Sequence, residues 1–170
     1  MPPVPQLTRL TALTLAIPIS SAGLARAQPP AAAPKPAAPA PPPDPATFLA
    51  GNAKAPGVKT LPSGLQYRIV RSGPAGPSPK AGDVIKVHYE GALTNGQVFD
   101  SSFARNRPAL MPLTNLVPAW MQAIPMMKVG DEWMLYAPPQ LGYGSTGMGP
   151  IPGNSVLVFR VKLLGMLSAD

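Results

Sequence analysis

The residue types in this chain of 170 residues exclude several kinds of catalytic site and favour one built from aromatic side chains. There is no cysteine and only one histidine, His88, which excludes disulfides, thiolate nucleophiles and histidine-rich metal sites. The remaining candidates are aromatic residues and one close carboxylate–guanidinium pair, Asp100 and Arg105. Such residues can line an apolar pocket that acts by binding and by excluding water, without a nucleophile or a metal.

Each of these side chains also has an ordinary structural interpretation. Aromatic residues at strand spacing most often belong to the core, and Asp100 with Arg105 is compatible with a solvated surface pair. His88 precedes Tyr89 in an expected strand, so alternation places the two side chains on opposite faces of the sheet. This position favours a structural role for His88 over a catalytic one.

The elements that must position these residues are mostly β-strands. Alternating or β-branched runs predict strands at residues 65–70, 84–89, 133–137 and 156–164. Asn95-Gly96 between apolar flanks predicts a hairpin turn into a further strand. A helix is expected at 118–124, because Pro118 suits its start and Pro125 prevents its extension. The economical architecture is an α+β fold, in which an antiparallel sheet packs against one helix.

The N-terminal residues are typical of an export signal followed by a spacer. Residues 1–27 combine an early positive charge, an apolar run at 10–19 and small residues up to Ala27, which is the pattern of a signal peptide. Ala25 and Ala27 are small residues at the two positions that a signal peptidase reads, so we expect cleavage after Ala27. The apolar run is too short for a stable membrane span. Residues 28–47 are rich in Pro and Ala and cannot build a core, which predicts a disordered linker.

A short helical lead-in is expected at residues 48–57, ahead of a folded domain at 58–168. Asp44 and Pro45 favour a helix start, because aspartate caps free backbone N–H groups and proline suits the first helical position. Gly51 weakens a longer helix, which limits the element to one or two turns.

The charge distribution argues against one class of partner. The formal net charge is +7, but the basic residues occur singly and form neither a stripe nor a known reading motif. We therefore expect no nucleic-acid binding and at most a weak attraction to acidic surfaces. No apolar heptad pattern precedes the folded domain, so we expect a monomer.

Six segments resemble, in order and in register, the FKBP family of peptidyl-prolyl isomerases. They are 87–91 (VHYEG), 96–102 (GQVFDSS), 117–120 (VPAW), 126–131 (MMKVGD), 141–144 (LGYG) and 151–159 (IPGNSVLVF). The resemblance covers about residues 58–167. Residues 60–67 (TLPSGLQY) are also similar to the exported bacterial branch that includes the macrophage infectivity potentiator group. The resemblance implies an antiparallel half-barrel sheet of about five strands, wrapped on one short helix.

The resemblance also implies a pocket whose residues are carried over position by position. Its catalytic residues would be Tyr89, Phe99, Asp100, Trp120 and Tyr143, and its substrate-binding residues Arg105, Leu116, Val117, Ile151 and Phe159. Trp120 would form the floor beneath a proline ring, and Arg105 would fix the Asp100 carboxylate. The Tyr143 hydroxyl and the Ile151 backbone N–H would hold substrate carbonyls. No metal or cofactor is implied.

The implied activity is cis–trans isomerisation of X-Pro bonds in unfolded or newly exported proteins, in the periplasm of a Gram-negative bacterium. Macrolides directed at this family are implied as further ligands. A chaperone that holds proline segments with little turnover is the alternative. It is favoured by Ala119, where the family has glycine, and by the short loop at 147–150. A protein that keeps only the fold is disfavoured by the complete set of pocket aromatics.

Overall fold

The computed structural model describes residues 42–169, so the predicted signal peptide and most of the predicted linker lie outside the described residues. In chain order the elements are α1 (Pro45–Asn52), β1 (Val58–Thr60), β2 (Gln66–Arg71), β3 (Val84–Leu93), β4 (Val98–Ser101), β5 (Ala109–Pro112), α2 (Pro118–Ala123), β6 (Glu132–Ala137) and β7 (Leu157–Leu167). Short 3₁₀ turns lie at Ile124–Met126 and Pro139–Leu141.

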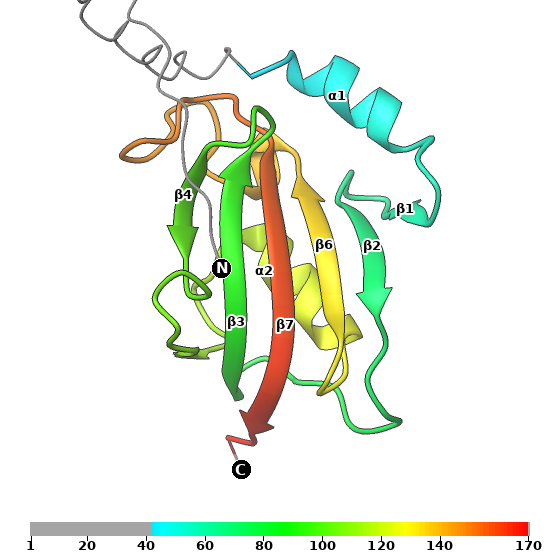
Figure 1. Cartoon of the computed structure of the whole chain (residues 1–170), viewed down its shortest axis with the longest axis vertical. Coiled ribbons are helices and arrows are strands. Elements are labelled where there is room, and N and C mark those ends of the chain that lie inside the picture. Colours follow the sequence, from blue (N-terminus) through cyan, green and yellow to red (C-terminus); the bar gives the residue numbers. More distant parts are fainter. Residues whose placement is uncertain (1–41, 170) are drawn as a thin grey trace, which may run out of the picture. The chain divides into compact units, whose positions relative to one another are not determined.

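The strands form one open antiparallel sheet in the order β1-β2-β6-β7-β3-β4. One edge of β3 pairs with β7 from Val84 to Leu93. Its other edge pairs with β5 at residues 84–87 and with β4 at residues 90–92. In the view of Figure 1, α2 lies behind this sheet. The predicted α+β class, with an antiparallel sheet on one short helix, is confirmed.

The sheet has seven strands, where about five were predicted. The two extra strands, β1 and β5, have three and four residues, which is too short for a diagnostic alternation. The hairpin predicted at Asn95-Gly96 joins β3 to β4. Gly96 adopts a φ of 85°, and its N–H donates to the Leu93 carbonyl at 2.9 Å. Glycine adopts this left-handed conformation without a steric cost, which explains the turn at this position.

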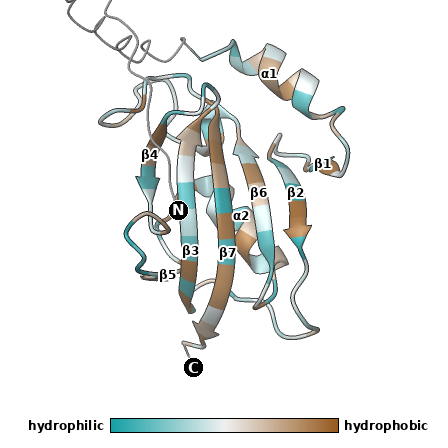
Figure 2. Ribbon diagram, viewed as in Figure 1, coloured by the Kyte–Doolittle hydropathy of each residue, from teal (hydrophilic) through white to brown (hydrophobic). Residues whose placement is uncertain are grey.

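Alternation along β7 places its apolar side chains in the core. Leu157, Phe159, Val161 and Leu163 are at most 4% exposed, whereas Arg160 between them is exposed. Figure 2 shows the same pattern as a mostly brown β7 interrupted by teal. The buried face of this strand, predicted from its alternation, packs towards α2 and the pocket described below.

The helix α2 is held short by its flanking residues, as predicted. Pro118 lies in its first turn, where the missing N–H removes no helical hydrogen bond. Pro125 lies in the following 3₁₀ turn, so the α-helix ends at Ala123. The buried side chains of α2 are Ala119, Trp120 and Ala123. The helix therefore presents one large aromatic side chain between small ones.

The N-terminal helix α1 begins at Pro45, inside the range predicted as linker. As expected, the Asp44 carboxylate caps it by accepting the Thr47 N–H at 3.0 Å. Phe48 contacts Tyr136 of β6, with ring centroids 6.3 Å apart. The ring contact places α1 against the sheet. Within residues 42–169, no helix has the length and apolar character needed to cross a bilayer.

Candidate functional site

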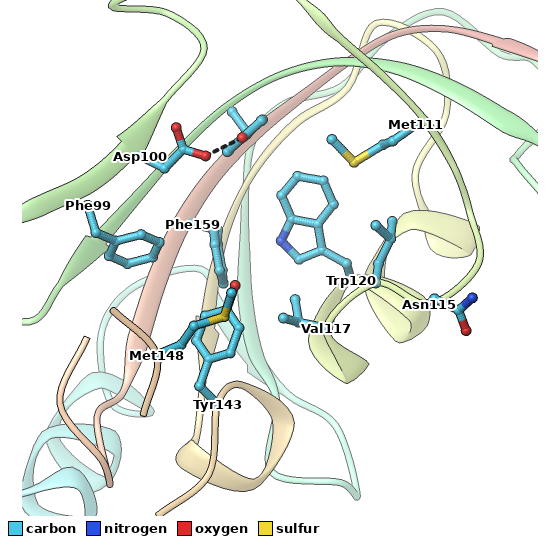
Figure 3. Close-up of a pocket in the computed structure, with 11 residues that line it drawn as sticks. Phe99, Asp100, Met111, Asn115, Val117, Trp120, Tyr143, Met148 and Phe159 are labelled. Carbon is cyan, nitrogen blue, oxygen red and sulfur yellow. Dashed lines mark hydrogen bonds between the residues drawn. The ribbon is translucent and has the colours of Figure 1, made fainter. Parts of the chain in front are cut away.

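A pocket of about 330 Å³ opens between the sheet and α2 (Figure 3). Most of its side chains are apolar or aromatic. The lining residues are Tyr89, Phe99, Asp100, Met111, Asn115, Leu116, Val117, Trp120, Tyr143, Met148 and Phe159. An apolar group that enters this space loses contact with water, which is the main favourable contribution such a pocket can make to binding.

Trp120 forms the base of the pocket and is 4% exposed. Its ring meets Tyr89 edge to face at 5.3 Å and Phe159 at 5.7 Å, with interplanar angles of 83° in both pairs. Perpendicular aromatic pairs are favourable and rigid, so the three rings hold one another in place. The indole N–H is buried without an acceptor in the described part of the chain, which leaves a donor at the pocket.

Phe99 closes another wall because β3 has no side chain at Gly91. The Phe99 and Phe159 rings are perpendicular, at 89°, with centroids 5.9 Å apart. A Cβ atom at Gly91 would lie 2.5 Å from two Phe99 ring atoms and 3.1 Å from Phe159. Glycine at this position is therefore required by the close approach of the two rings, and not by an unusual backbone conformation.

The polar edge of the pocket is a network of Tyr89, Asp100 and Arg105. The Tyr89 hydroxyl and the Arg105 guanidinium each donate to a different oxygen of the Asp100 carboxylate. Burial raises the pKa of the Asp100 carboxyl, but the hydrogen bonds and the positive charge of Arg105 outweigh it, so the pKa lies below its ordinary value. Burial, together with the hydrogen bond to Asp100, raises the pKa of the Tyr89 phenol. At neutral pH the network therefore holds an ionised carboxylate and a protonated phenol.

Ser102 fixes the backbone of Tyr89 from the end of β4. Its fully buried hydroxyl oxygen accepts the Tyr89 N–H at 2.7 Å and donates to the Tyr89 carbonyl, 3.1 Å away. His88 Nδ1 lies 3.1 Å from the same oxygen. The direction of this third hydrogen bond depends on the tautomer of His88, because the hydroxyl has one proton and both the Tyr89 carbonyl and Nδ1 lie within its reach. His88 also stacks on Phe103 at 4.8 Å, so its contacts agree with the predicted structural role.

A second hollow of about 270 Å³ adjoins the pocket beneath the loop that precedes β7. It shares Phe99, Asp100, Tyr143 and Met148 with the main pocket. Its remaining lining residues are Gly149, Pro150 and Ile151. The two hollows therefore adjoin, and together they are called the groove.

The Ile151 N–H, predicted to hold a substrate carbonyl, takes part in a hydrogen bond within its own loop. The Ile151 N–H donates to the Met148 carbonyl at 2.9 Å, and the Met148 N–H donates back to the Ile151 carbonyl at the same distance. The Ile151 N–H is therefore already satisfied and is not free to hold a substrate carbonyl. By contrast, the Tyr143 hydroxyl has no hydrogen-bond partner within residues 42–169, so it remains available to a ligand.

Eight of the ten site residues predicted from the sequence line the main pocket together. The other two lie beside it: Arg105 holds the Asp100 carboxylate, and Ile151 lines the second hollow. Sequence reasoning missed Met111, Asn115 and Met148. Met111 lies on the short strand β5, which was not predicted, and an isolated methionine in a loop carries no signal for a binding site.

Residues 76–164 match the sequence pattern of the FKBP-type peptidyl-prolyl cis-trans isomerase, and residues 42–69 match that of the domain amino-terminal to such isomerases. The chain is 48% identical over 119 residues to the FKBP-type peptidyl-prolyl cis-trans isomerase FkpA of Aeromonas hydrophila, covering 70% of this chain and 44% of that protein. It is 47% identical over 120 residues to the peptidyl-prolyl cis-trans isomerase Mip of Coxiella burnetii, covering 70% of this chain and 52% of that protein.

Among solved structures, the crystal structure of FkpA from Escherichia coli superposes with a TM-score of 0.71 and 38% identity. The superposition covers 74% of this chain and 59% of that one. The chain thus matches about half the length of the two curated relatives.

Proposed function

Because the chain belongs to the family of FKBP-type peptidyl-prolyl cis-trans isomerases, we propose that it isomerises X-Pro bonds in unfolded or newly exported polypeptides. The observation that carries this proposal is the pocket in which Trp120, Tyr89 and Phe159 hold one another at right angles. We assign the isomerase domain to residues 58–168.

The reaction suits a pocket without a nucleophile. Rotation about an X-Pro bond crosses a barrier of about 18–20 kcal/mol, which comes from amide resonance, and it neither makes nor breaks a covalent bond. Catalysis therefore requires only that the twisted amide is bound more tightly than either planar form. Each tenfold acceleration needs about 1.4 kcal/mol of such preference, which several modest interactions can supply together.

Each part of the pocket has a role in this proposal. The proline ring packs on Trp120 in the pocket whose walls include Phe99 and Phe159, and these apolar walls exclude the water that favours the planar, charge-separated amide. The Tyr143 hydroxyl donates to a substrate carbonyl. The carbonyl of the twisted bond lies at the edge formed by Tyr89 and Asp100, where Arg105 fixes the carboxylate.

The alternative is a chaperone that holds proline segments with little turnover. Ala119 was one reason to consider it, because alanine replaces a family glycine beside Trp120. The Ala119 side chain is fully buried and does not line the pocket. Its methyl group therefore does not reduce the space for a proline ring. The replacement of glycine by Ala119 thus does not favour the chaperone over the isomerase.

We place the protein outside the cytoplasm, in the periplasm of a Gram-negative bacterium. The support is the leader-like pattern of residues 1–27, with small residues up to Ala27. We further propose that the folded domain is monomeric and that macrolides directed at this family compete with X-Pro segments for the pocket.

Refolding of a protein whose slow phase is limited by proline isomerisation distinguishes the isomerase from the chaperone. The protein from Gln28 to Asp170 would be added far below the concentration of the refolding chain. An isomerase accelerates the slow phase at this ratio, and a macrolide ligand of the family abolishes the effect. Slower refolding, with an effect only near equimolar protein, would support the chaperone.

A further inference from the structure

The groove contains a sulfur atom in an unusual position. Met148 lines both the main pocket and the adjoining hollow, yet it is 60% exposed to solvent. In the view of Figure 3, Met148 lies beside Tyr143, and Met111 lies across the Trp120 ring from them. A side chain at this point is within reach of a ligand in the pocket and is open to small reagents in solution.

The backbone of the loop keeps Met148 in place. Two hydrogen bonds of 2.9 Å tie it to Ile151. A Cβ atom at Gly147 would lie 2.3 Å from the Ile151 carbonyl oxygen, and one at Gly153 would lie 1.9 Å from the Ser145 carbonyl oxygen. The loop is thus closely packed on itself. A chemically modified Met148 side chain would therefore stay in the groove and change its surface, because the loop backbone has little room to move the residue away.

We propose that Met148 is an oxidation-sensitive substrate contact, at which hypochlorous acid converts the thioether to a sulfoxide and thereby weakens catalysis. This inference rests on the proposed function of the groove. The sulfur loses two electrons and gains one oxygen atom, and hypochlorous acid is reduced to chloride with release of one proton. The chain has no cysteine to compete for the oxidant, so methionine sulfur is its most readily oxidised group.

The sulfoxide changes the wall of the groove from apolar to polar. Thioether sulfur is soft and makes favourable contacts with aromatic rings, whereas a sulfoxide is polar and chiral and disrupts such surfaces. The other methionines provide an internal comparison. Met126 is 40% exposed but lines neither hollow, and Met127 is fully buried. Only oxidation at the groove is expected to alter turnover.

The test oxidises the parent protein, Met148→Leu and the matched control Met126→Leu with limiting hypochlorous acid. Peptide mass spectrometry follows the gain of oxygen at each methionine. The kcat/KM for an X-Pro peptide is compared with each protein's own value before oxidation, and circular dichroism confirms that the fold is retained. Peptide affinity is measured in parallel from tryptophan fluorescence, so the groove can be assessed even without turnover.

We expect Met148 to be oxidised before Met127, with a loss of about three- to tenfold in kcat/KM for the parent and for Met126→Leu. Met148→Leu should keep most of its own activity, and methionine sulfoxide reductase should restore the parent. Complete oxidation of Met148 with unchanged kcat/KM and peptide affinity would overturn the inference. Equal loss in Met148→Leu, at a dose of oxidant that leaves the other pocket methionine, Met111, without added oxygen, would also overturn it. An inactive parent before oxidation would instead refute the proposed function, and the change in peptide affinity would then decide the role of Met148.

Discussion

The contact between Gly91 and the Phe99 ring gives a sharp prediction for Gly91→Ala. The new Cβ would lie 2.5 Å from two ring atoms of Phe99, whereas carbon atoms in ordinary contact are separated by about 3.5 Å. The ring must therefore move by about 1 Å, or the strands must separate. Gly91 has no positive φ, so alanine fits the backbone and the whole effect comes from this contact.

Two magnitudes follow from that displacement. Overpacking of this kind costs about 1–3 kcal/mol of stability, and the low end applies because the Phe99 ring is only half-buried and can move. The activity should suffer more, because a misplacement of about 1 Å in a binding wall can cost up to about a hundredfold. We therefore expect Gly91→Ala to fold and to lose at least about tenfold in kcat/KM.

The assay compares kcat/KM for an X-Pro peptide with the free energy of unfolding in urea. Gly165→Ala is the matched control, since Gly165 also lies in a strand but a Cβ atom there would meet nothing within 4 Å. The control should keep its activity and change stability by less than about 0.5 kcal/mol. Full activity in a folded Gly91→Ala protein would show that the position of the Phe99 ring does not matter for turnover.

Three further predictions concern the surroundings of the pocket. The pKa of Asp100 lies below its ordinary value, so ionised Asp100 stabilises the fold above about pH 4, and this stabilisation is lost as the pH falls through the folded-state pKa. In acid titrations of the fold, Arg105→Gln should shift this loss of stability to higher pH. Ser102→Ala leaves the buried Tyr89 N–H without its acceptor, which should lower the free energy of unfolding in urea by about 1–3 kcal/mol and also lower kcat. Ser102→Thr should restore part of both losses. An unchanged kcat would contradict the positioning role of Ser102. Phe48→Ala removes the ring contact between α1 and the sheet and should cost about 1–2 kcal/mol without changing kcat/KM, so a loss of activity there would be unexpected.

Local chemistry explains why much of the fold could be predicted from the sequence. The Asn95-Gly96 turn, the two prolines around α2 and the alternation in β7 each leave few conformations open. The strands β1 and β5 carry no such signal. They exist because β2 and β3 present free edges with which a short segment can pair, and this depends on the rest of the sheet.

The same distinction applies to the site. Aromatic residues such as Trp120 and Phe159 stand in recognisable motifs, and the structure brings them together. The conformation of its loop places Met148 in the groove, and the Ile151 N–H donates a hydrogen bond within that loop. Neither fact is encoded in a motif, because both depend on how a turn rich in glycine packs on itself.

The exchange between the cis and trans forms of an X-Pro peptide, followed by NMR without a coupled enzyme, tests the central claim most directly. Trp120→Leu keeps an apolar side chain at the base of the pocket but removes the ring that meets Tyr89 and Phe159. We predict that a catalytic amount of the parent accelerates exchange and that folded Trp120→Leu does so at least about tenfold less. No acceleration by the folded parent, or equal acceleration by Trp120→Leu, would contradict the claim that this pocket catalyses prolyl isomerisation.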